Sequence, residues 1–135
     1  MKLLVLTGEP ISAQQLRDAI GDDVEPEKAE VMVVAPALQE SPIKFWFSDA
    51  DEAIERAEDV RRETVERLGQ SGVSASGDTG ESDPFAAIYD ALASFNADRI
   101  VLFKRPGEDQ RYREDIDPEK VRERFGLPVD EATVS

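Results

Sequence analysis

The chain has 135 residues, two fifths of them apolar, which is enough for one compact domain with a buried core. Thirty acidic against sixteen basic residues give a formal net charge of −14, which excludes nucleic acid and anionic membranes as expected partners. Absence of cysteine and histidine excludes disulfides, the usual zinc sites and the Ser-His-Asp triad. Without a membrane-length apolar run or a signal peptide, we expect a cytoplasmic protein whose residues 1–135 form a single domain.

The first part of the chain predicts two buried strands joined by a short helix. An apolar strand is expected over Lys2–Thr7, and a second over Val31–Ala35. Between them, Ser12 and Gln15 have the spacing of a capping box, and Gly21 can end the helix. The predicted inner face of this helix consists of Ala13, Leu16 and Ile20.

A long connection with an aromatic cluster leads into the longest predicted helix. Phe45-Trp46-Phe47 has two interpretations, an anchor that packs beside the next helix or a patch that faces a protein partner, and the first is favoured. Ser48 and Asp51 are expected to cap the helix. One face of it carries Ala53, Ala57, Val60, Thr64 and Leu68.

The stretch from Val73 to Phe103 predicts a complete strand, helix, strand unit. Val73–Gly77 opens it, and Asp83-Pro84 combines a helix-capping carboxylate with a proline suited to the first helical position. The apolar run Arg99–Phe103 then indicates a strand buried on both faces. A buried strand reached through a helix implies a parallel crossover.

After this unit, the charged segment Lys104–Ile116 is expected to be an exposed loop. Asp117-Pro118 starts a last helix, Gly126 ends it, and Leu127–Val134 is a candidate fifth strand. Strands and helices therefore alternate along the whole chain. This order predicts an α/β fold with a five-stranded, mostly parallel sheet and helices on both faces, which is Rossmann-like.

Four short motifs in the second half of the chain carry a family resemblance. Gly77-Asp78, Asp83-Pro84, Ala87-Ile88 and Ala97–Val101 resemble the corresponding half of a universal stress protein domain. The resemblance implies an adenine nucleotide alpha hydrolase-like fold and a role in stress response or regulation. It also implies a homodimer formed through the last strand, Leu127–Val134.

Nucleotide-binding members of that family hold ATP with an aspartate after the first strand and a glycine-rich loop after the fourth. Here Thr7 stands in place of the aspartate, and only Gly107 fits the glycine pattern. We therefore expect a non-catalytic protein that does not bind ATP in the family manner; the alternative is an ATP- or AMP-binding protein with a non-standard phosphate site. By family position, the candidate nucleotide contacts are Thr7, Gly8, Val34, Lys104, Arg105 and Gly107.

The basic residues after the fourth strand allow two interpretations. In one, they form an anion site made by Lys104, Arg105, Arg111 and Arg113. In the other, which is favoured, they belong to a solvated loop in which nearby carboxylates offset their charge. Those carboxylates are Glu108, Asp109, Glu114 and Asp115.

Overall fold

The computed structural model describes residues 1–39, 51–107, 110, 111, 114 and 116–134. They form a Rossmann-like α/β fold with a five-stranded sheet in the order β3-β2-β1-β4-β5, in which every neighbouring pair is parallel. The strands are β1 (Lys2–Thr7), β2 (Glu30–Pro36), β3 (Ser74–Gly80), β4 (Arg99–Lys104) and β5 (Val129–Thr133). The helices are α1 (Ala13–Ile20), α3 (Asp51–Gln70), α4 (Pro84–Leu92) and α5 (Pro118–Phe125), with a 3-10 turn, η1 (Pro26–Lys28).

Helices α1, α4 and α5 begin where the sequence predicts, because their capping residues make the expected hydrogen bonds. Ser12 and Gln15 form a complete capping box at α1, with each side chain accepting from the other residue's backbone N–H. Asp83 and Asp117 each accept from the N–H two residues later, at 3.0 and 2.9 Å. Gly126 ends α5 in the left-handed conformation, with φ of 66°.

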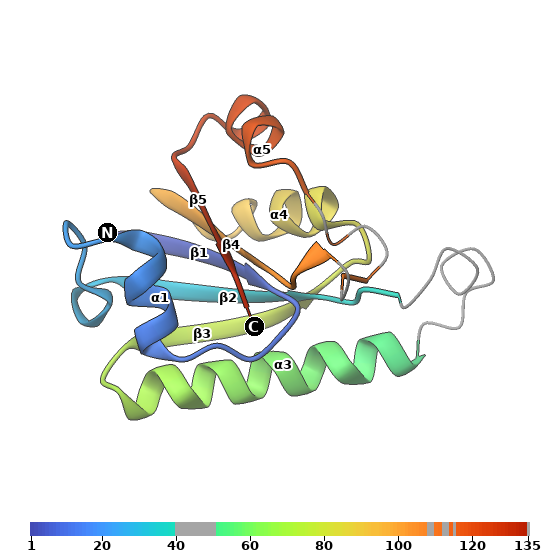
Figure 1. The fold of residues 1–135 in the computed structure, drawn as a ribbon, viewed down its shortest axis with the longest axis horizontal. Helices are drawn as coiled ribbons and strands as arrows, with labels where there is room; N and C mark the ends of the chain where they lie inside the picture. Colours follow the sequence, from blue (N-terminus) through green and yellow to red (C-terminus); the bar gives the residue numbers. More distant parts are fainter. Residues whose placement is uncertain (40–50, 108–109, 112–113, 115, 135) are drawn as a thin grey trace.

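Helices cover both faces of the sheet, so that there is an apolar core on each side (Figure 1). Successive residues of β1 alternate between them: Leu3 and Val5 pack with α1 and α3, whereas Leu4 and Leu6 pack with α4 and α5. None of the described helices is both long and apolar enough to cross a membrane.

The end of β3 differs from the sequence-based prediction. β3 continues to Gly80, three residues beyond the expected end, because it stays paired with β2 as far as Pro36. α3 runs to Gln70, and Gly72 provides the left-handed turn after it, with φ of 83°. Phe45-Trp46-Phe47 and the predicted cap Ser48 lie outside the described residues, so both interpretations of the aromatic cluster stay predictions.

The strand order places a topological switch point between β1 and β4. From β1 the chain builds the sheet outward through β2 to β3, and then returns to add β4 on the other side of β1. In open α/β sheets, ligands bind beyond the carboxyl ends of the strands at such a point. The candidates for a ligand site are therefore the residues that follow β1, which ends at Thr7, and β4, which ends at Lys104.

Candidate functional site

The turn after β1 is closed by the Thr7 side chain. The hydroxyl of this buried threonine donates to the Glu9 carbonyl at 2.6 Å and accepts from the Glu9 N–H at 3.2 Å. Gly8 lies close to the neighbouring connection, because a Cβ on it would stand 3.0 Å from the Cδ1 of Leu38. Thr7 therefore shapes the turn, and Gly8 allows two loops to approach one another.

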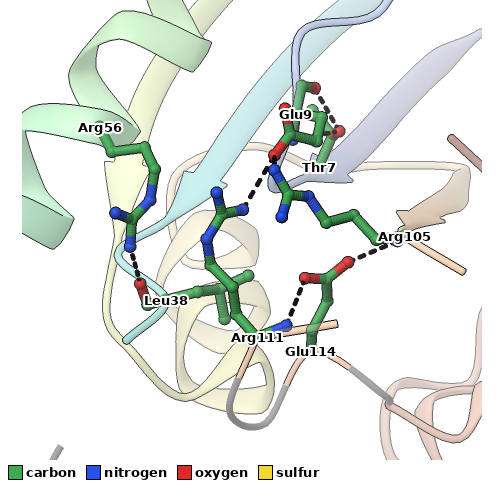
Figure 2. Close-up of polar contacts among 7 residues, drawn as sticks. All are labelled: Thr7, Glu9, Leu38, Arg56, Arg105, Arg111 and Glu114. Carbon is green, nitrogen blue, oxygen red and sulfur yellow. Dashed lines mark hydrogen bonds and ion pairs between the residues drawn. The ribbon is translucent and has the colours of Figure 1, made fainter. Parts of the chain in front are cut away.

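Glu9 is the centre of an ion-pair cluster at the switch point (Figure 2). Its Oε1 pairs with Arg105 and with Arg111, the latter at 2.9 Å. Both arginines follow β4, so the cluster joins two segments far apart in sequence, with Arg111 102 residues after Glu9. The Arg111 side chain is only 9% exposed, compared with 25% for Glu9 and 28% for Arg105. The carboxylate thus stands between two guanidinium groups, in the position that an anion would take.

A second carboxylate, Glu114, fixes the course of the loop after β4. It is 5% exposed and accepts from the backbone N–H groups of Arg105 and Arg111, the latter at 3.0 Å. Ile116 is also buried, against the α4 and α5 side of the sheet. The prediction that this whole segment is an exposed loop is therefore wrong, because the side chains of Glu114 and Ile116 are buried.

Almost no space is left directly beside Gly8. The hollow beside Gly8, at the carboxyl ends of β1 and β4, has a volume of about 10 Å³. That is room for about one water molecule, whereas small-molecule sites span roughly 300–1,000 Å³. Leu38, Glu114 and Ile116 line it, and the Leu38 carbonyl accepts from Arg56 of α3 at 2.5 Å (Figure 2). The chain itself therefore fills the space directly beside Gly8 at this edge of the sheet.

Neither protein-family models nor curated protein sequences match this chain. The resemblance to universal stress proteins therefore stays a prediction.

The structure separates the residues that the sequence assigned to one nucleotide site. Thr7, Gly8 and Arg105 do lie at the switch point. Lys104 lines the same hollow as Gly8, and its ammonium group pairs with Glu131 of β5 at 3.2 Å, so its charge is offset within the sheet.

The two remaining predicted contacts are Gly107 and Val34. Gly107 borders open space, since a Cβ on it would meet no atom within 4 Å. Val34 points to the α4 side of the sheet and lines a separate groove next to that helix. Val34 therefore lines a different hollow from Gly8 and Lys104.

Sequence reasoning missed Glu9 and misjudged Glu114. Glu9 comes two residues after the end of β1, so the sequence could have predicted a carboxylate at the carboxyl edge of the sheet. Glu114 was counted among the charges of a solvated loop, and nothing in its local sequence indicates burial. Within the described parts of the chain, no group of three or more acidic side chains is arranged to hold a metal ion.

Proposed function

We propose that this chain is a non-catalytic regulatory or stress-response protein, similar in fold to universal stress proteins, that does not bind ATP in the manner of that family. The observation that carries the proposal is the switch-point hollow of about 10 Å³, which is more than an order of magnitude too small for a nucleotide. Entry of a nucleotide would require Leu38 and Ile116 to leave a packed site.

The polar groups at the same edge also oppose a phosphate. The guanidinium groups of Arg105 and Arg111 donate to Glu9, and the backbone N–H groups of the same two residues donate to Glu114. A triphosphate would have to compete for these donors beside two carboxylates, whose negative charge repels it. The carboxylates of Glu9 and Glu114 therefore occupy the donors that a bound phosphate would need.

Calorimetric titration with ATP, ADP and AMP in the presence of Mg²⁺ tests this proposal. We expect no saturable heat with any of the three, in a preparation that circular dichroism shows to be folded. Saturable binding to the wild-type protein that Leu38→Ala changes and Arg67→Gln leaves unchanged would contradict it.

A second function, binding of AMP or another small anion at a non-standard site, is favoured by one observation. A hollow of about 630 Å³ lies next to the cluster, and Arg67 and Arg105 line it together with Glu9. Its volume suits a small ligand, and its two cations suit an anion. AMP binding that Arg67→Gln weakens and Leu38→Ala leaves unchanged would support this function over the first.

We further propose a homodimer formed through β5, which is an edge strand of the sheet. The Val134 N–H donates to Lys104 and the Pro128 carbonyl accepts from Ile100, so every second residue of β5 bonds to β4. The backbone groups of Thr133 therefore point away from the sheet.

Thr133→Pro would remove an outward N–H while leaving the bonds between β4 and β5 in place. We expect a dimer for the wild-type protein and a monomer for Thr133→Pro by light scattering. A variant that stays dimeric, or a monomeric wild-type protein, would refute the use of this edge.

A further inference from the structure

A second hollow of small-molecule size in the described part of the molecule is a groove on the α4 side of the sheet. It has a volume of about 640 Å³ and lies over the carboxyl halves of β2 and β3. Its apolar surface includes Met32 and Val34 of β2 and Ala87 and Ala91 of α4. Ile54 of α3, which is 46% exposed, adds an apolar side chain at the rim.

The groove exists because α4 is too short to cover this face. α4 has nine residues, whereas α3 on the opposite face has twenty. Gly80 lets the start of α4 approach closely, with Ala87 only 2.7 Å from the position of a Cβ on it. Farther along the strands, Met32 is only half-buried and Ser76 is exposed. The result is an apolar floor that no described element covers.

The rim of this groove is negatively charged. Four carboxylates line it, and its described lining contains no lysine or arginine. They come from β3, from the following turn and from α4: Asp78, Glu81, Asp83 and Asp90. Asp78 and Asp90 are both exposed, and they stand on the two elements that flank the floor. A concave surface of one charge sign concentrates its field and raises the local concentration of cations.

We propose that this groove binds an aliphatic polyamine. Such a ligand places ammonium groups at intervals along a chain of methylene groups, which matches a groove that combines several carboxylates with an apolar floor. The volume lies within the range of small-molecule sites. Phosphorylated ligands would be repelled by the rim, and a bare metal ion would gain nothing from the apolar floor. Hydroxyl groups of Thr79, Ser82 and Ser94 provide further acceptors.

Titration with spermidine at about 0.15 M salt tests the proposal, because diffuse electrostatic attraction is strongly screened there. We expect saturable binding of one ligand per chain. The double variant Asp78→Asn, Asp90→Asn should weaken it about tenfold, the loss expected for two exposed charge contacts. Asn at position 78 keeps the side-chain oxygen that accepts from the Thr79 N–H, so the turn is retained.

A matched control separates the groove from the overall charge of the protein. Glu66→Gln, Glu123→Gln removes the same two charges from exposed positions on α3 and α5, away from the groove, and should leave the affinity unchanged. Ala91→Trp, which places a large side chain in the groove, should abolish binding. Absence of saturable binding, or equal losses in both double variants, would overturn the proposal. Tighter binding of a lysine-rich peptide than of spermidine would overturn the assignment to a small polyamine.

Discussion

Replacement of Glu9 by alanine tests the ion-pair cluster at the switch point. The substitution removes the carboxylate that Arg105 and Arg111 share and leaves two guanidinium groups facing the same space. The Arg111 side chain is 9% exposed, so solvent cannot replace the lost partner fully. We therefore expect Glu9→Ala to lower the free energy of unfolding.

The size of the effect follows from the burial of the three side chains. Exposed ion pairs contribute at most about 1 kcal/mol, whereas breaking a buried pair costs about 3–5 kcal/mol. Glu9 and Arg105, at 25% and 28% exposed, lie between these limits, which gives a loss of about 2–3 kcal/mol. For a chain of 135 residues, 1 kcal/mol corresponds to about 3.5 °C in Tm. The expected decrease is about 7–11 °C.

Urea denaturation and differential scanning calorimetry measure this decrease directly. Glu63→Ala is the matched control, because it removes the same charge from a more exposed ion pair. The Glu63 side chain is 49% exposed and that of its partner Arg67 is 44% exposed. We expect it to cost about 0.5 kcal/mol or less. Equal effects of the two substitutions would refute the view that the cluster holds the switch point together.

Three further substitutions test other parts of the structure. Gly80→Ala should destabilise the fold by about 1–3 kcal/mol in urea denaturation, because the new methyl group meets Ala87. Gly107→Ala is its control and should have little effect. Equal effects of the two substitutions would contradict the close packing of β3 and α4. Asp117→Ala should cost about 1 kcal/mol through loss of the α5 cap, and a cost also seen for Asp117→Asn would point to another cause. Arg99→Lys should cost about 1–2 kcal/mol, since lysine cannot reproduce the contacts of Arg99 with Asp130 and Asp23. The hydrogen bond from Arg99 to Asp130 raises the pKa of the arginine, so the stabilisation is present while the guanidinium is charged and is lost only as the pH rises through that raised pKa. The destabilisation caused by Arg99→Lys should therefore be the same at about pH 6 and pH 9.

Much of the fold could be predicted because its signals are local. Asp83-Pro84 and Asp117-Pro118 place a capping carboxylate and a proline at the helix start, and neither depends on distant residues. The buried strand β4 likewise follows from an apolar run. The end of β3 could not be predicted from local sequence, because Asp78 and Gly80 have weak strand propensity and are held in the strand by pairing with β2.

The candidate site was predictable only in its position. The carboxyl ends of β1 and β4 follow from element order, but the partner of Arg111 is Glu9, 102 residues away, and no local pattern joins them. Burial of Glu114 depends on the hydrogen bonds that it accepts from the backbone of Arg105 and Arg111, which a charged sequence does not indicate. Val34 was assigned by family position, yet side-chain alternation along β2 directs it to the α4 groove.

The most direct test of the central claim is a nitrogen-proton NMR titration of the wild-type protein with ATP and Mg²⁺. It reports on the backbone amides of Thr7, Gly8 and Arg105 individually, which line or border the filled switch point. We predict that these three signals do not move at any nucleotide concentration used. Saturable shifts of all three, with the rest of the β1 and β4 amides unchanged, would contradict the claim that the chain fills its own nucleotide position.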